Sequence, residues 1–349
     1  MPPFKALASP RKRKVVIVTF GGGARDEETF APEGQENIPH LMTALLPRGT
    51  FFTQVVNRGI LGHYVATTSL ATGVYETINN FTGDAPANPT LFECFRKNRR
   101  RPAEDAWVVS PSRGFAHMGA STAKGYGTEY GAGVILPKQL LSAATPSNSI
   151  NDVLHLLRDN YEEPYFAPEL SQDGRHVRQL EDLLKLSVGD FTRHAMTLSS
   201  ADELSVYVAR RVMEQMAPTL LWITLHDIDI AHSGTYSLYV EGIQRTDRLC
   251  LDLWQSVQAN PEYAGNTTMF ILPDFGRDSD SNPGGNGFQH HRTGDALSRT
   301  TWMLALGQGV REGAFIERPV DSLDLVPTVS RLLDFDVPSA QGHFLPEVA

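Results

Sequence analysis

Cysteine is nearly absent from the sequence, and its scarcity excludes two kinds of site. Only Cys94 and Cys250 occur among the 349 residues, so no metal-type cysteine spacing exists and no disulfide framework can be argued. A single bridge between the two stays open at this point. So few cysteines fit a reducing compartment, where structural disulfides are rare, without establishing one.

Long apolar runs are absent as well. No stretch of the sequence reaches the roughly 18–20 apolar residues that a membrane-spanning helix needs. The apolar segment at residues 15–20 is too short for the core of a signal peptide and has the length of a buried strand. We therefore expect a soluble protein without a membrane span, cytoplasmic, or periplasmic if a signal peptide has been removed.

The sequence also lacks an excess of positive charge. It has 31 Lys and Arg residues against 40 Asp and Glu, a net charge of -9, which disfavours a nucleic-acid partner. One basic run, Arg11–Lys14, precedes the first apolar segment. We interpret residues 1–13 as a solvated basic lead-in, and a localisation signal or an anion-binding patch are the alternatives.

What the sequence does have is a globular composition, with 41% hydrophobic and 20% charged residues, and a repeated alternation of strand and helix patterns. Short apolar segments typical of strands occur at 15–20, 50–56, 106–110, 219–225, 267–272 and 301–306. This order predicts an α/β fold, a doubly wound and mainly parallel sheet with helices on both faces. We expect one domain over 14–349 with a helical and loop insertion at about 111–215, in which residues 111–150 are extended loops.

Polar residues follow two of the predicted strands, where a sheet of this kind binds its ligands. The candidate metal ligands are Asp227, Asp229, His232, Asp274, His290 and His291. Carboxylate and imidazole groups together suit zinc or a similar divalent ion. Such clusters also occur as structural networks without a metal, so both interpretations stay open on the residues alone.

Several motifs resemble the alkaline phosphatase superfamily, in particular its sulfatases and type I phosphodiesterases. The stretch Val320–Thr328, followed by two leucines and Gly342, is similar to the D-x-x-P-T ending of these enzymes. Asn37–Leu41 matches N-x-P-x-L, Leu70–Gly73 matches L-x-T-G, and Asp274–Gly276 resembles D-H-G. The matches cover about residues 14–75 and 219–345, and their shared order is more specific than any one of them.

The resemblance implies an alkaline phosphatase-like fold and a hydrolase of small anionic esters, phosphate or sulfate. In that family two metal ions flank a Ser, Thr or formylglycine nucleophile. Three positions depart from the pattern. The aspartate after the first strand falls at Gly21, the nucleophile falls at His63, and the histidine of the D-H pair is Phe275.

Since the departures gather in one half of the site, we expect a divergent member with at most one metal site, for which the ligand types favour zinc, or with none. Asp229 and His232 with His291 or His290 are the implied ligands, and Asp227 is an alternative for Asp229.

The remaining site residues concern catalysis and the anion. His63 is either the catalytic group, a metal ligand, or a structural residue that hydrogen-bonds near a helix start. Asn57, Arg58 and Arg277 are expected to bind the anion of the substrate.

Two functions remain from the sequence. One is a metal-dependent hydrolase of phosphate or sulfate esters, and the other is a catalytically inactive pseudoenzyme that binds a protein partner or serves in assembly. A phosphomutase-like transferase ranks third, because it normally needs both metal ions.

Overall fold

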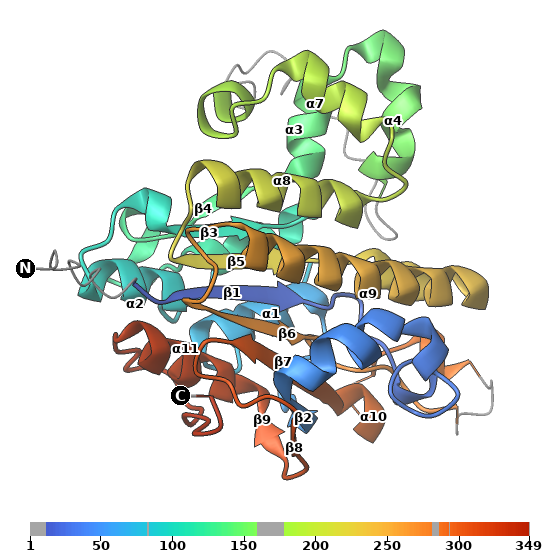
Figure 1. Cartoon of the computed structure of the whole chain (residues 1–349), viewed down its shortest axis with the longest axis vertical. Coiled ribbons are helices and arrows are strands. Elements are labelled where there is room, and N and C mark those ends of the chain that lie inside the picture. The colour runs from blue at the N-terminus through green and yellow to red at the C-terminus, as the bar shows by residue number, and fades with distance from the viewer. Residues whose placement is uncertain (1–11, 82–83, 159–177, 281–285, 293, 349) are drawn as a thin grey trace, which may run out of the picture.

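The computed structural model describes residues 12–81, 84–158, 178–280, 286–292 and 294–348. A sheet of nine strands runs through the middle of the molecule in the order β4-β3-β5-β1-β6-β7-β2-β8, and β9 pairs with β2 (Figure 1). The strands are β1 (Lys14–Thr19), β2 (Gly49–Val56), β3 (Ala106–Val109), β4 (Gly133–Ile135), β5 (Leu220–Thr224), β6 (Thr267–Leu272), β7 (Thr300–Gly307), β8 (Ala314–Ile316) and β9 (Val320–Asp321).

The sheet is mainly parallel, which confirms the predicted fold class. Strand β1 lies between β5 and β6 and pairs with both in parallel. Strand β3 is parallel to β4 and β5, and β2 is parallel to β8 and β9. Within the described residues only β7 runs antiparallel to its neighbours, β6 and β2. The carboxyl ends of β1, β5 and β6 therefore lie together at one edge of the sheet, the edge that forms ligand sites in open α/β folds.

Helices cover both faces of the sheet (Figure 1). The described α-helices of the chain are α1 (His63–Thr72), α2 (Leu91–Asn98), α3 (Pro137–Ala144), α4 (Ile150–Leu157), α7 (Val188–Ala195), α8 (Ala201–Gln215), α9 (Tyr236–Ala259), α10 (Ala296–Arg299) and α11 (Leu325–Leu333). Helix α1 is capped at its carboxyl end by Gly73, which takes the left-handed conformation with φ of 70° that glycine favours.

Strand β1 shows why a central strand needs an uninterrupted apolar run. Val16 and Val18 belong to the apolar core that includes α8 and α9, whereas Val15 and Ile17 belong to the core that includes α1, α2 and α11. Successive strand residues point to opposite faces, and both faces of this sheet are covered. The run at residues 15–20 is therefore explained by its position at the centre.

The segment between β3 and β5 carries a helical layer. Helices α3, α4 and α7 stand beyond α8 at the top of Figure 1 and share one apolar core with it. The predicted insertion at about 111–215 and the single domain over 14–349 stay predictions about domain organisation. The predicted basic lead-in covers residues 1–13. Residues 1–11 of it lie outside the described part of the chain, which begins at Lys12.

The prediction that residues 111–150 form extended loops is wrong in part. They contain β4, which adds an edge strand beside β3, and helix α3, which begins with Pro137 at its first position. A strand of three residues is too short to show a period of two in the sequence. Its place in the sheet comes from pairing with β3, which no local pattern reveals.

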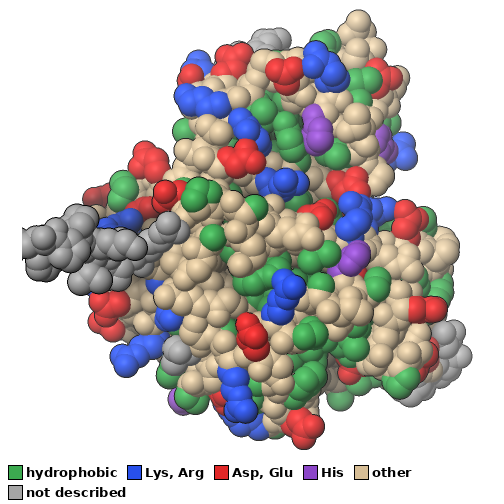
Figure 2. All heavy atoms as spheres, viewed as in Figure 1, with side chains coloured by type: hydrophobic (Ala, Val, Ile, Leu, Met, Phe, Trp, Pro, Cys, Tyr) green, Lys and Arg blue, Asp and Glu red, His purple; other side chains and the backbone are tan. Residues whose placement is uncertain are grey.

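The surface seen in Figure 2 carries both signs of charge. Lys and Arg side chains are interspersed with Asp and Glu over this face, instead of gathering in one basic area. None of the described helices is long and apolar enough to cross a membrane.

The position of each phenylalanine in the sheet generates a prediction about stability. Phe270 is fully buried in the central strand β6, whereas Phe315 on the edge strand β8 is 61% exposed. We expect Phe270→Ala to lower the free energy of unfolding by about 3–5 kcal/mol, because it leaves a cavity between tightly packed layers. Phe315→Ala is the matched control and is expected to cost less than about 1 kcal/mol. Urea unfolding measures both, and equal losses would contradict the assignment of the core.

Candidate functional site

The turn after β1 has no room for a side chain at its first position. A Cβ atom on Gly21 would lie 1.4 Å from the carbonyl oxygen of Leu225, in the chain that leaves β5. Gly22 and Gly23 follow with φ of 105° and 67°, a region that favours glycine. The acidic residue that the resemblance places here is therefore excluded by the path of the backbone itself.

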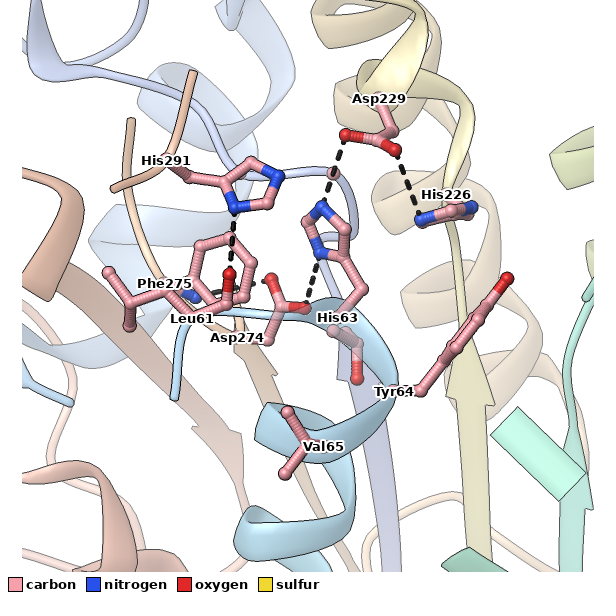
Figure 3. A network of polar contacts seen from close by, with 12 residues as sticks. Leu61, His63, Tyr64, Val65, His226, Asp229, Asp274, Phe275 and His291 are labelled. Carbon is pink, nitrogen blue, oxygen red and sulfur yellow. Dashed lines mark hydrogen bonds and ion pairs between the residues drawn. The ribbon is translucent and has the colours of Figure 1, made fainter. Parts of the chain in front are cut away.

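His63 lies at the first position of α1 and joins two buried carboxylates (Figure 3). Its Nδ1 atom lies 2.7 Å from Oδ2 of Asp274, which follows β6, and its Nε2 atom lies 3.1 Å from Oδ1 of Asp229, which follows β5. The ring of Phe275 stacks on the His63 ring with 4.5 Å between centroids. Three residues predicted from the sequence thus meet at one point, and Phe275 holds the imidazole from one side.

Two further histidines complete the group. His232 Nε2 lies 3.2 Å from Asp229 Oδ1 and 2.9 Å from His291 Nε2. His291 Nδ1 lies 2.8 Å from the carbonyl oxygen of Leu61, which only accepts hydrogen bonds. The proton of a neutral His291 is therefore on Nδ1, and its Nε2 presents a lone pair to the centre of the group.

These four residues fit a divalent metal ion. One ligand atom from each of His63, Asp229, His232 and His291 lies within 4.8 Å of the other three. Three of the pairs, His63–Asp229, His232–Asp229 and His232–His291, are 2.9–3.2 Å apart, close to the edge of about 3.3 Å expected for a tetrahedron with zinc–nitrogen bonds near 2 Å. Hydrogen bonds from the outer ring nitrogen to a carboxylate or a backbone carbonyl are typical of metal-binding histidines. His63 has the first kind of partner and His291 the second.

The histidines of the group differ in charge. Burial lowers the pKa of His232 to about 2 and that of His291 to about 3, and the positive charge of Arg277 adds to both shifts. Burial acts against the charge of His63 too, but Asp274 and Asp229 outweigh it and raise its pKa to about 9. At neutral pH His232 and His291 are thus neutral, as ligands must be, while His63 is protonated in the metal-free protein.

Arg277 lies inside the protein, not at a ligand-facing surface. It is fully buried, and Nη2 donates to Asp229 Oδ1 at 2.6 Å and to the carbonyl of Gly22. Nε donates to the carbonyl of Gly23 at 2.9 Å, and Nη1 to that of Phe288 at 3.2 Å. Its donors are directed at protein acceptors, which does not match the anion-binding role expected from the sequence.

The other two expected anion-binding residues also have protein partners. Arg58 is exposed and forms an ion pair with Asp321. Asn57 is buried, where its Nδ2 donates at 3.0 Å to the carbonyl of Asp274 and its Oδ1 accepts from the backbone of Gly59 at 2.8 Å. Asn57 therefore supports the segment that carries Asp274. Anion binding by these two residues stays a prediction.

Three of the predicted metal ligands, Asp227, Asp274 and His290, are not members of the four-residue group. Asp274 instead bonds to Nδ1 of His63, the outer ring nitrogen. Asp227 Oδ2 lies 3.3 Å from Nη1 of Arg245, so its carboxylate is engaged by α9. The side chain of His290 is not in the group. Its backbone carbonyl accepts a hydrogen bond of 2.9 Å from the backbone N–H of Asp278. Of the alternatives that the sequence left open, the structure places Asp229 and His291 in the group.

Two residues that support the group were not among the candidates predicted from the sequence. His226 Nε2 lies 3.6 Å from Asp229 Oδ2, and its ring packs edge-on against His63 with 4.9 Å between centroids. Asp202, in the first turn of α8, accepts hydrogen bonds of 2.8 Å from the backbone N–H groups of His226 and Asp227. His226 stands in the polar run after β5, so its signal was present. Asp202 gives no such signal, because only tertiary packing brings it to this loop.

No protein-family model matches the sequence, and a comparison with curated proteins finds no relative. Solved structures do match over nearly the whole chain. Wild-type alkaline phosphatase PafA has 13% identity and a TM-score of 0.59, with 97% of this chain and 99% of that chain covered. Phosphonate monoester hydrolase SpPMH from Silicibacter pomeroyi has 11% identity and a TM-score of 0.58, over 96% and 76% of the chains.

A third match is the lipoteichoic acid synthase LtaP from Listeria monocytogenes, with 12% identity, a TM-score of 0.53, and coverage of 96% and 75%. At identities this low the likeness concerns the fold, and activity has to be argued from the site. A further match bears the name of a protein in the alkaline phosphatase superfamily. The chain has the fold of the alkaline phosphatase superfamily, as the order of its sequence motifs predicted.

Proposed function

We propose that this protein is a hydrolase of phosphate or sulfate esters that uses one divalent metal ion, zinc by ligand type, held by Asp229, His232 and His291. One observation carries the proposal. The Nε2 atom of His232 lies 3.2 Å from the Asp229 carboxylate and 2.9 Å from Nε2 of His291, all three ligand atoms lie within 4.8 Å of one another, and both imidazoles are neutral at physiological pH. Three protein ligands with one open position are typical of catalytic zinc sites.

His63 is the catalytic group in this proposal. Its bond to Asp274 fixes the ring through Nδ1 and leaves Nε2 as the atom that exchanges a proton. The pKa of about 9 belongs to the metal-free protein, and a bound ion would lower it so that Nε2 is free to act as a base. His63 Nε2 takes the proton of the attacking water and returns it to the alkoxide that leaves. A water oxygen bonds to phosphorus or sulfur while the ester bond breaks, so no further reactant is needed.

The bound ion would polarise the anionic oxygens of the ester and stabilise the charge that develops on them. The substrate reaches the site from the side of His232, whose side chain is 20% exposed against 6% for His63. Phe275 and the buried wall around His63 exclude solvent behind the reacting group. A small anionic ester is the class of substrate that this arrangement supports.

The first prediction concerns metal content, with adjacent histidines as matched variants. We expect about one divalent ion per chain in protein purified without chelators, and loss of that ion in His291→Ala, since this removes one of three ligands. His290→Ala is the control and should keep the ion, because that side chain is not in the group. Elemental analysis measures the ion. Metal-free wild-type protein, or equal loss in both variants, would contradict the proposal.

The second prediction separates catalysis from metal binding at His63. We expect His63→Ala to keep the ion but to lower hydrolysis of an aryl phosphate, phosphodiester or sulfate on the order of 100-fold or more, as loss of a general base does. Steady-state rates and elemental analysis are measured on the same samples.

Two outcomes would overturn this role. If His63→Ala loses the metal, His63 is a fourth ligand of a closed site. If the metal-loaded wild type hydrolyses none of these esters, the pseudoenzyme alternative, a binding module with a protein partner, takes the place of the hydrolase.

The third prediction follows from the charges of the metal-free site. At about pH 7.5 His63 is protonated, since its pKa is about 9, whereas His232 and His291 carry no proton that a metal must displace. A divalent ion beside His63 lowers that pKa by like-charge repulsion and expels the proton. Zinc titrations in buffers of different ionisation enthalpy should therefore report about one proton released in the wild type and about none in His63→Ala. Release of two or three protons would show that the pKa values are ordered differently.

A further inference from the structure

Arg277 is the largest charged side chain that is wholly enclosed next to the proposed metal site. It ranks among the largest fully buried side chains of the described residues, in company with tryptophan and tyrosine. Burying a guanidinium is costly unless its donors are matched, and here Gly22, Gly23 and Phe288 supply carbonyls while Asp229 supplies the carboxylate. The donors of this buried guanidinium are therefore matched by acceptors around the proposed metal site.

The glycine turn is shaped to receive this guanidinium. Gly22 and Gly23 both have positive φ, which turns their carbonyl groups to Arg277. A Cβ on Gly22 would lie 2.4 Å from the backbone nitrogen of Asp229, so no larger residue fits there. Gly21 leaves no room for an acidic side chain at the same turn. The turn after β1 thus offers carbonyl acceptors to a fixed cation and no carboxylate to a metal ion.

Arg277 also shares its carboxylate oxygen with the proposed metal site. Oδ1 of Asp229 lies 2.6 Å from Arg277 Nη2, 3.1 Å from His63 Nε2 and 3.2 Å from His232 Nε2. An ion bound at this oxygen would therefore have a permanent positive charge as its neighbour, because an arginine side chain does not lose its proton in proteins. Two positive charges on one oxygen repel each other strongly inside a protein.

We infer that Arg277 is a built-in cation that takes the place of a second metal ion beside Asp229, limits the site to one ion and weakens the binding of that ion. This inference rests on the metal site proposed above and adds a residue that sets the number and affinity of ions. The guanidinium keeps its charge in every metal-binding state, so its positive charge at Asp229 does not depend on metal supply.

The test is zinc binding to the wild type, Arg277→Met and Arg277→Lys, with Arg292→Met as the matched control. Arg292 lies on the same segment, but its side chain is 55% exposed and pairs with Asp278. Isothermal titration gives stoichiometry and affinity, elemental analysis confirms the content, and circular dichroism establishes that each variant is folded.

We expect one zinc ion per wild-type chain and at least about tenfold tighter binding in Arg277→Met, because the repelling charge and the competing donor are gone. Arg277→Lys keeps the charge and should stay within about threefold of the wild type. Arg292→Met should match the wild type. Unchanged or weaker binding in folded Arg277→Met would overturn the inference, and so would two tightly bound ions in the wild type, a result that needs no variant.

Failure of the inference is distinct from failure of the proposed function. One zinc ion in the wild type without turnover of any ester sinks the hydrolase but leaves the role of Arg277 intact. Zinc binding by Arg277→Met alone means that Arg277 keeps the metal out, which supports the inference and contradicts a metal-dependent wild-type enzyme. Zinc binding by neither protein overturns both.

Discussion

The carboxylate of Asp229 is the interaction on which the candidate site depends. It is wholly buried in the loop after β5. Its Oδ1 atom contacts ring nitrogens of His63 and His232 and the guanidinium of Arg277. Burial by itself would raise its pKa, but His63, His226 and Arg277 more than compensate and hold that pKa below its usual range. A buried anion of this kind is stable only with its partners in place, so the loops after β1, β5 and β6 have to close on it together.

The backbone around Asp229 explains which of these partners are available. The glycine turn after β1 packs against the chain after β5 so closely that it contributes carbonyl oxygens alone. Positive charge at the site must therefore come from side chains or from an ion held on the far side of Asp229. In the metal-free protein, Arg277 and protonated His63 supply this positive charge. In the proposed site, His232 and His291 would hold the ion beside Asp229.

His63 is the residue at the start of α1 through which two carboxylates from different strands are joined. It occupies the start of α1, where the resemblance places a hydroxyl or formylglycine nucleophile. An imidazole at this position spans the distance between Asp274 and Asp229, which are brought together from two different strands. Phe275 then stacks on the ring where the resemblance implies another histidine. The two departures belong together, since one residue fills the space beside the other.

Much of the fold could be predicted from the sequence, because local patterns express it. The apolar run of β1 follows from burial on both faces, and the end of α1 follows from Gly73 in its left-handed conformation. Strand β4 could not be predicted, since three residues carry no period. For the candidate site, the polar runs after β5 and β6 identified the right loops, but not which of two neighbouring histidines points inward.

The sequence by itself determined the alternation of the longer strands with helices, the absence of a metal-type cysteine spacing, and the loops in which the polar residues gather. Spacing along the chain encodes these features, and tertiary contacts do not alter them. Only the tertiary structure decided that His291 and not His290 joins Asp229, that Asp227 turns to Arg245, and that Arg277 is enclosed. These choices depend on side-chain direction and on contacts between residues far apart in the sequence, such as Arg277 and Asp229, which are 48 positions apart. Such contacts arise only when the sheet brings the ends of its strands together.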